Sequence, residues 1–454
     1  MLTALLAIAG AVCWRPALYA TGLWVDGGQP TVSQTLFEDP SASPSASQPA
    51  RGSGVIASAP VATPTHTPDP KALAAALAKV PAKDMGTTSG VVLDAASGEL
   101  LWSSRPDAGQ IPASTLKLLT CLTALDVLGP DKTFSTRVVQ QGKGIVLVGG
   151  GDPYLASKPA KEYPFPATSA DLAKKTAAAL KKQGMSSVTL GYDESLFSGP
   201  NWHPSWPQGY HDQVTNLSAL WIDKGKPDEK SAPSQTPAPT AATVFAAQLK
   251  ANGITVSGKP TAAAAGADAA EVASVQSLPV SSLVQETLVH SDNAAAEVLL
   301  RQVGVATGNG GSFTGGAKGM QQRLTTLKAW DASTRIADGS GLSRNNRVSA
   351  RVLGRALHLA AASPKLRPLL EGLPSAGVTG TLHLRFYTPA SEPGRGWVNA
   401  KTGTLSKVST LAGYTRTRQG GEVVFAFMSN NPKQEWNVRS WLDQMASTLV
   451  TCGC

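Results

Sequence analysis

The sequence predicts an α+β fold in which one antiparallel sheet packs against helices. Segments with the pattern of strands occur near both ends of the foldable region, and long helical patterns fall between them. Of the 454 residues, 42% are hydrophobic, a fraction that is ordinary for globular proteins and sufficient for a sizeable core. The length leaves room for more than one domain.

Five segments near the two ends are expected to form the sheet. They are residues 89–94, 99–103, 396–402, 409–417 and 422–429. The first two flank a short turn and predict a hairpin. A helix near residues 71–80 is expected to open the folded region, and another over residues 434–450 to close it. The closing helix places its large hydrophobic side chains on one face: Val438, Trp441, Leu442, Met445 and Leu449.

Residues 133–270 carry the signals of an inserted subdomain. Its expected elements are strands over 134–139, 144–148 and 187–192 and helices over 169–183 and 241–252. The polar stretch 224–239 is expected to be a surface loop. The glycines at 149–151 predict a tight turn and no phosphate loop, because no Lys-Ser or Lys-Thr pair follows them. Residues 71–132 and 271–454 then form the two parts of the main domain.

Two segments precede the folded region. Residues 1–25 begin with an apolar run from Leu2 to Cys13, which has the length of an export signal and is too short to span a bilayer. A longer span would include Arg15. The segment is expected to be either a cleaved export signal or an uncleaved anchor, and both place the rest of the chain outside the cytoplasm. Residues 26–70 are rich in Ser, Pro and Ala and predict a disordered linker.

The formal net charge of +9 suggests an acidic partner surface. For an exported protein, the acidic partner would be an anionic cell wall or lipid headgroups. Alternatively, the basic residues form a solvated surface that has no special partner. Nucleic acid is not expected as a partner, because no run of Lys and Arg is interleaved with aromatic residues.

Four cysteines fit an oxidising compartment. Cys121 either pairs with Cys452 or Cys454, or is free and buried while the chain end frays. No zinc site is predicted, since the only close pair is Cys-Gly-Cys and no histidine lies near it in the sequence.

The first candidate site motif is Ser114-Thr115-Leu116-Lys117, at the start of a segment that is apolar on nearly every side. A helix of this kind must be buried, and Ser114 and Lys117 share a face of its first turn. Burial lowers the pKa of a lysine, which a general base for a serine hydroxyl requires. Taken alone, the motif also fits an N-cap serine followed by a lysine that reaches solvent.

The second motif is Ser291-Asp292-Asn293, expected at a turn between two helical stretches. Ser291 is expected to face Lys117 and to pass a proton to a leaving amine, and Asn293 to hold an amide carbonyl of the substrate. Taken alone, the tripeptide also fits an ordinary capping turn.

The third motif is Lys401-Thr402-Gly403-Thr404, expected at a strand end. Gly403 would allow a substrate backbone to approach closely, and Lys401 offers positive charge beside it. The hydroxyls of Thr402 and Thr404 are candidates for binding a terminal carboxylate. The backbone N–H groups of Ser114 and Thr404 are candidates for an oxyanion hole. Taken alone, the motif also fits a strand end with a surface lysine.

These motifs, S-x-x-K, S-D-N and K-T-G in that order, resemble the class C low-molecular-mass penicillin-binding proteins, the D-alanyl-D-alanine carboxypeptidase and endopeptidase family. The resemblance extends from about Gly86 to the last helix. Further stretches that look like the family are Gly149 to Pro153, Tyr192-Asp193 with Phe197, Ala295 to Glu297, Asp338 to Arg344 with Asn346, and Gly377 to Leu382.

The resemblance implies a penicillin-binding-protein/serine β-lactamase-like transpeptidase domain that carries an inserted subdomain. It also implies an extracytoplasmic serine D,D-peptidase acting on peptidoglycan stem peptides, in which Ser114 attacks the D-Ala-D-Ala carbonyl and is acylated by β-lactams, with no metal or cofactor. One rival is a β-lactamase, which needs an extra carboxylate that no motif locates. Another is a silent wall-binding protein, against which the intact motif residues argue.

Overall fold

The computed structural model describes residues 66–226 and 232–454. The expected export segment or anchor, residues 1–25, lies outside the described residues, as does the expected linker of residues 26–70 except for its last five residues. Within the described part of the chain, no helix is both long enough and apolar enough to cross a membrane.

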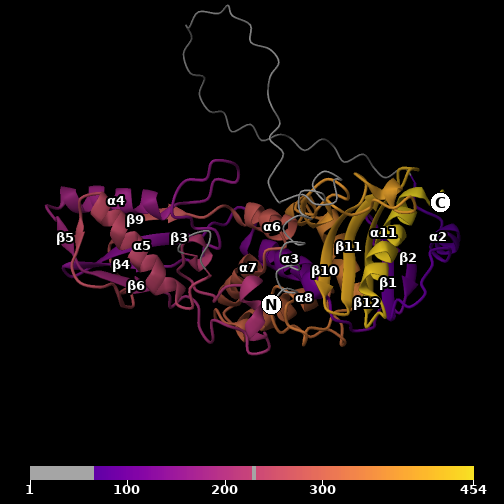
Figure 1. The fold of residues 1–454 in the computed structure, drawn as a ribbon, viewed down its shortest axis with the longest axis horizontal. Coiled ribbons are helices and arrows are strands. Elements are labelled where there is room, and N and C mark those ends of the chain that lie inside the picture. The colour runs from indigo at the N-terminus through magenta and orange to yellow at the C-terminus, as the bar shows by residue number, and fades with distance from the viewer. Residues whose placement is uncertain (1–65, 227–231) are drawn as a thin grey trace, which may run out of the picture. The chain divides into compact units, whose positions relative to one another are not determined.

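The central sheet joins the two ends of the folded region (Figure 1). Its strand order is β10-β11-β12-β1-β2, and all neighbours are antiparallel. The strands are β1 (Thr87–Asp94), β2 (Leu100–Ser104), β10 (Asn399–Leu405), β11 (Val408–Arg416) and β12 (Glu422–Asn430). Val91 of β1 stands opposite Ala426 of β12, so an early strand pairs with the last one. The predicted five-stranded antiparallel sheet is therefore confirmed.

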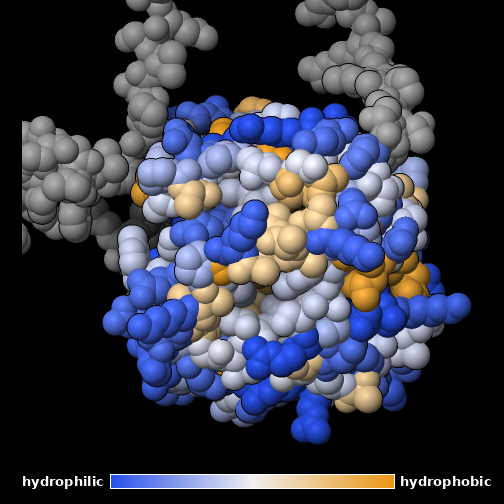
Figure 2. Space-filling model, turned by 90° about the vertical axis from the view of Figure 1, so that its right-hand side faces the viewer, coloured by the Kyte–Doolittle hydropathy of each residue, from blue (hydrophilic) through white to orange (hydrophobic). Residues whose placement is uncertain are grey.

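The sheet separates two hydrophobic cores. Side chains of a strand alternate between faces, so Phe425 and Phe427 of β12 enter one core and Ala426 the other. Helices α2 (Pro70–Leu77) and α11 (Glu435–Thr451) cover the Phe425 face. The opposite face carries α3 (Lys117–Leu128), α6 (Val280–Val289), α7 (Asn293–Ala306), α8 (Phe313–Thr326), α9 (Ala350–Ala362) and α10 (Pro368–Glu371). The surface in Figure 2 is mostly hydrophilic, with hydrophobic residues in small patches.

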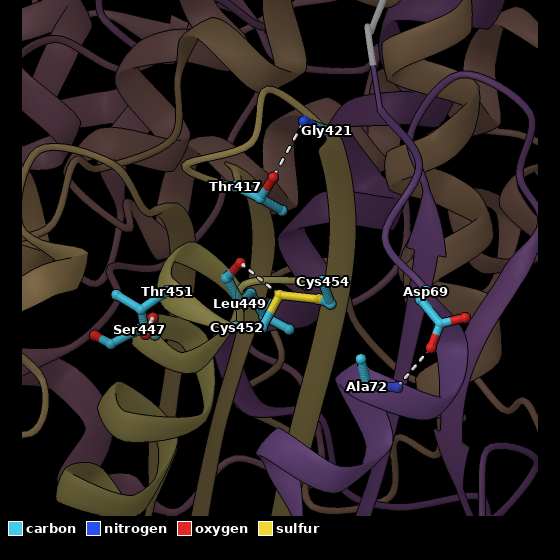
Figure 3. The surroundings of a disulfide bond; sticks show 9 residues. All are labelled: Asp69, Ala72, Thr417, Gly421, Ser447, Leu449, Thr451, Cys452 and Cys454. Atoms are coloured by element: carbon cyan, nitrogen blue, oxygen red, sulfur yellow. Dashed lines mark hydrogen bonds between the residues drawn. A yellow bond between two sulfur atoms is a disulfide. The ribbon is translucent and has the colours of Figure 1, made fainter.

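The two cores explain the cysteine pairing. Cys452 and Cys454 form a disulfide with each other at the end of α11 (Figure 3). Cys121 is free and buried in α3, in the core on the other side of the sheet. The expected alternative of a pair between Cys121 and a C-terminal cysteine is wrong, because the sheet lies between the two cores. The alternative of a free, buried Cys121 is the one observed, and the chain end is closed by its own disulfide.

We keep the name inserted subdomain for the expected segment of residues 133–270 together with the strand that follows it. These residues form a second sheet, with the order β8-β6-β4-β3-β9. Its strands are β3 (Ser135–Gln141), β4 (Gly144–Val148), β6 (Leu190–Asp193), β8 (Thr261–Ala262) and β9 (Glu271–Gln276), and helices α4 (Ser169–Lys182) and α5 (Pro237–Ala251) accompany them. Because β9 pairs with β3, the sheet continues past the expected boundary at residue 270. The strand expected over 187–192 is divided, since β5 (Ser187–Val188) pairs separately with β7 (Thr255–Val256). The expected loop 224–239 ends early, where α5 begins.

Helix α3 is buried from Lys117 to Leu125, and the contribution of this burial to stability can be tested at Leu122. Its side chain is fully buried in the core. Leu122→Ala should lower the free energy of unfolding by about 2–5 kcal/mol, through lost burial and the cavity left behind. Guanidinium unfolding followed by tryptophan fluorescence measures this. Val127→Ala, at a half-buried position of the same helix, is the control, and an equal effect of both changes would contradict the assignment.

Candidate active site

A strained turn presents Ser114 at the start of α3. Ser114 lies in a short 3-10 helix, Ala113–Leu116, that leads directly into α3. Ala113 has a φ of 48°, a left-handed conformation that is uncommon for a residue with a side chain. The Pro112 carbonyl oxygen accepts hydrogen bonds from the hydroxyls of Thr115, at 2.7 Å, and of Thr410 in β11, at 2.8 Å. The sheet therefore fixes the turn that carries Ser114.

Lys117 follows one turn later and is fully buried. Its Nζ lies 3.0 Å from Ser114 Oγ, 2.7 Å from Asn293 Oδ1 and 2.8 Å from the Ser340 carbonyl oxygen. Burial lowers the pKa of Lys117 to about 8, and the carboxylates of nearby acidic residues oppose that shift. The amine therefore loses its proton far more readily than a surface lysine.

The partners of Lys117 indicate how a neutral amine would be oriented. Asn293 Oδ1 and the Ser340 carbonyl oxygen can only accept hydrogen bonds. Together they use both N–H groups of a neutral amine, so the lone pair is left for the third partner, the Ser114 hydroxyl. That hydroxyl can donate its hydrogen to Nζ, which is the arrangement that a general base for a serine nucleophile needs.

The second motif supplies Asn293 to this cluster. Asn293 is the first residue of α7, and Asp292 caps the helix by accepting the Ala295 N–H at 3.0 Å. The Asn293 amide nitrogen donates to the Gln213 carbonyl oxygen at 2.9 Å, which turns its oxygen toward Lys117. Ser291 has a φ of 55° and lines the same cleft as Ser114. Within the described residues its hydroxyl forms no hydrogen bond with Lys117, and the proton transfer expected of Ser291 stays a prediction.

The third motif forms β10, at the edge of the sheet. Lys401 is buried and donates to the Thr402 carbonyl oxygen at 2.9 Å. Burial and the nearby Lys117 lower the pKa of Lys401, so its positive charge is held less firmly than on a surface lysine. The Thr402 hydroxyl donates to the Thr381 hydroxyl at 2.8 Å. Thr402 and Thr404 both line the cleft.

Gly403 is the point where β10 meets the turn that carries Ser114. A Cβ atom at this position would lie 2.6 Å from the Pro112 carbonyl oxygen and 3.1 Å from the Ser114 nitrogen, so only glycine fits. The Ala400 N–H points away from β11 and bonds to the Pro374 carbonyl oxygen. Because backbone groups alternate along an antiparallel strand, the Thr404 N–H faces the same outer edge.

Glu297, to which sequence reasoning gave no role, holds one of the partners of Lys117. It is fully buried in α7, and its two carboxylate oxygens accept the N–H groups of Gly339 at 2.9 Å and Ser340 at 2.7 Å. These bonds fix the turn that presents the Ser340 carbonyl oxygen. Burial and the adjacent Asp338 raise the pKa of Glu297 to about 8. An acidic residue inside an apolar helix was the signal in the sequence.

Asp338 braces the same turn from its other side. Its Oδ1 accepts the Asn346 amide at 2.7 Å, and its Oδ2 accepts the Trp206 indole N–H at 2.9 Å and the Ser343 N–H at 2.6 Å. Trp206 lies within residues 133–270, the segment of the inserted subdomain, and its side chain packs with Phe313 and Leu342 of the main domain. Asp338 therefore joins the turn beside Lys117 to that subdomain.

The motifs meet in a cleft of about 980 Å³. The main domain contributes Ser114, Ser291, Asn293, Thr402 and Thr404 to its lining, and the inserted subdomain contributes residues 209–215 and Lys224. Among the described residues, no group of three His, Cys, Asp or Glu side chains is placed to hold a metal ion. The arrangement of a hydroxyl, an amine base and an open strand edge suits acyl transfer to and from Ser114.

Comparisons with known proteins agree with this geometry. The model of the D-Ala-D-Ala carboxypeptidase 3 (S13) family matches residues 70–227 and 219–449. The chain is similar to a carboxypeptidase of Mycobacterium tuberculosis, with 37% identity over 87% of each chain. It is also similar to the D-alanyl-D-alanine carboxypeptidase of an Actinomadura species, with 27% identity over 78% of this chain and 80% of that one.

A solved structure shows the same fold. The crystal structure of penicillin binding protein 4 from Haemophilus influenzae matches with a TM-score of 0.66 and 22% identity, and the match covers 83% of this chain and 98% of that one. Fold, motif order and family match lead to one conclusion. The chain belongs to the D-Ala-D-Ala carboxypeptidase 3 (S13) family and is a low-molecular-mass penicillin-binding protein.

Proposed function

We propose that the protein is a serine D-Ala-D-Ala carboxypeptidase that acts on peptidoglycan stem peptides, with Ser114 as its nucleophile. The single observation that carries the proposal is the buried Lys117 amine, which lies 3.0 Å from Ser114 Oγ. Its two other partners are acceptors, so its lone pair is directed at the hydroxyl. The family match supports the reaction, and the cleft gives room for a peptide.

In the acylation step, Ser114 Oγ attacks the carbonyl carbon between the two D-alanines, and Lys117 Nζ takes the hydroxyl proton. The negative charge that develops on the carbonyl oxygen is stabilised by the N–H groups of Ser114 and Thr404. The position of Gly403 against the Ser114 nitrogen supports this pairing.

The proton then goes to the nitrogen of the departing D-alanine, and we assign its transfer to Ser291, which lines the cleft between the helices. The C–N bond breaks, and D-alanine leaves with a neutral amine and an ionised carboxylate. Water, deprotonated by the same amine, attacks the Ser114 ester and releases the shortened peptide. A β-lactam opens its ring in the first step and has no fragment to release, so Ser114 remains acylated.

Recognition of the substrate is assigned to β10 and Asn293. Thr402 and Thr404 line the cleft, and we assign their hydroxyls to binding the terminal carboxylate, with the buried Lys401 contributing positive charge. Asn293 has one amide hydrogen on Gln213 and a second one left for a substrate carbonyl.

The site of action is proposed to lie outside the cytoplasm, where peptidoglycan is found. The net charge of +9 supports association with an anionic wall or membrane surface. The apolar segment at residues 1–25 supports export or anchoring.

The pH dependence of acylation tests the role of Lys117. The base must be neutral, and burial lowers its pKa to about 8. The second-order rate constant for acylation by a penicillin should therefore fall about tenfold per pH unit below pH 8 and level off above it. Stopped-flow mixing with a fluorescent penicillin measures this constant. A midpoint near 10.5, the ordinary lysine value, would contradict the assignment.

Ser114→Ala tests the nucleophile. The variant should stay folded by circular dichroism, lose all covalent labelling by fluorescent penicillin and release no D-alanine from a D-Ala-D-Ala peptide. Ser103→Ala, which removes an exposed hydroxyl from β2, should behave like the unchanged protein. Persistent labelling of Ser114→Ala would refute the role. In the unchanged protein, rapid turnover of the drug would indicate a β-lactamase, and neither labelling nor release would indicate a wall-binding protein.

A further inference from the structure

We propose that Lys224 is a positioning residue for acylation, through which the inserted subdomain holds Asp292 and with it the first turn of α7 that brings Asn293 to Lys117. The inference rests on the proposed function of Ser114 and Lys117. It gives the inserted subdomain a part in the chemical step itself, beyond forming a wall of the cleft.

The ion pair between Lys224 and Asp292 is the first observation. Lys224 Nζ donates to Asp292 Oδ2, while Asp292 Oδ1 caps α7. The side chain of Asp292 is 10% exposed and that of Lys224 is 37% exposed, so the pair is only partly screened by water. Lys224 also has a φ of 55°, a strained backbone conformation in the turn that directs it toward α7. The inserted subdomain thus contacts the middle residue of the S-D-N motif directly.

Two further contacts from the inserted subdomain reach the other supports of Lys117. The Gln213 carbonyl oxygen accepts from the Asn293 amide, which orients the amide oxygen toward Lys117. The Trp206 indole donates to Asp338, which braces the turn carrying Ser340. Both acceptors of the Lys117 amine are therefore held, directly or through one residue, by the inserted subdomain.

The charges around Lys117 give the expected direction of an effect. Burial lowers the pKa of its amine, and four neighbouring groups raise that pKa: Glu297, Asp338, Asp292 and Cys121. Lys401 on β10 also lies close to the amine. The positive charges of Lys224 and Lys117 both favour the ionised form of Asp292, which also lies near the Tyr154 hydroxyl. Burial raises the pKa of Asp292, whereas Lys224, the Ala295 N–H and Lys117 lower it. The Ala295 N–H and Lys117 remain when Lys224 is removed, and we take Asp292 to stay ionised in that variant. Its unbalanced negative charge then raises the pKa of Lys117, so the base stays protonated to higher pH.

The test uses Lys224→Met, which keeps the apolar stem and removes the charge. The midpoint of the acylation profile should move upward by about half a pH unit or more, and acylation at neutral pH should slow about threefold or more. Lys224→Arg keeps the charge and should restore both values. Lys365→Met is the matched control, because Lys365 is also half-exposed and pairs with a buried aspartate, Asp126, and it does not line the cleft. Its profile should equal that of the unchanged protein.

An unshifted midpoint in Lys224→Met would overturn the inference, whether or not the rate falls, and so would a rise in KM for a D-Ala-D-Ala peptide with kcat unchanged. The second result would make Lys224 a substrate contact only. Thermal unfolding checks the fold, and Lys224→Gln is judged by the same midpoint should the Met variant unfold. If the unchanged protein is neither labelled by penicillin nor releases D-alanine, the proposed function fails, and this result is distinct from failure at Lys224 alone.

Discussion

A single buried amine constrains the rest of this active site. Lys117 is fully enclosed, and an ammonium ion in such a place is costly unless it is paired or loses its proton. Two carbonyl oxygens and one hydroxyl surround Nζ, so a neutral amine has a partner for each N–H and for its lone pair. Among the residues that the structure describes, the nearby acidic side chains form hydrogen bonds with backbone groups and not with the Lys117 amine. Glu297 accepts two backbone N–H groups, and Asp292 caps a helix. This allows a neutral base at moderate pH.

The fold explains why such a cluster can form from remote segments. Pairing of β1 with β12 closes the sheet with both ends of the chain, and α3 packs on the face of that sheet opposite α11. The edge strand β10 then meets the turn before α3 at Gly403, where no side chain fits. The inserted subdomain completes the site, because its Gln213 carbonyl and Trp206 indole hold residues that in turn hold Lys117. The segment inserted between the first two motifs therefore helps to hold the groups that surround the Lys117 amine.

Much of this could be predicted from the sequence where the signal is local. The five strands and the last helix follow from periodicity over a few residues, and the shared face of Ser114 and Lys117 follows from one helical turn. Contacts made by backbone atoms leave no such signal in the sequence. The Ser340 and Gln213 carbonyl oxygens accept hydrogen bonds from Lys117 and Asn293, and any residue at these positions would carry the same carbonyl group. The pairing of Cys452 with Cys454 and the isolation of Cys121 depend on which face of the sheet each one occupies, and this is a tertiary property.

The state of the Lys117 amine is the central claim, and its direct titration is the most direct test. Lysine labelled with carbon-13 at Cε reports the charge of each amine by NMR, and the signal missing from a Lys117→Met variant identifies the one in question. The account predicts that this signal titrates at about pH 8 in the protein without substrate. Titration near the ordinary value of 10.5 would show a charged amine at neutral pH and would contradict the account.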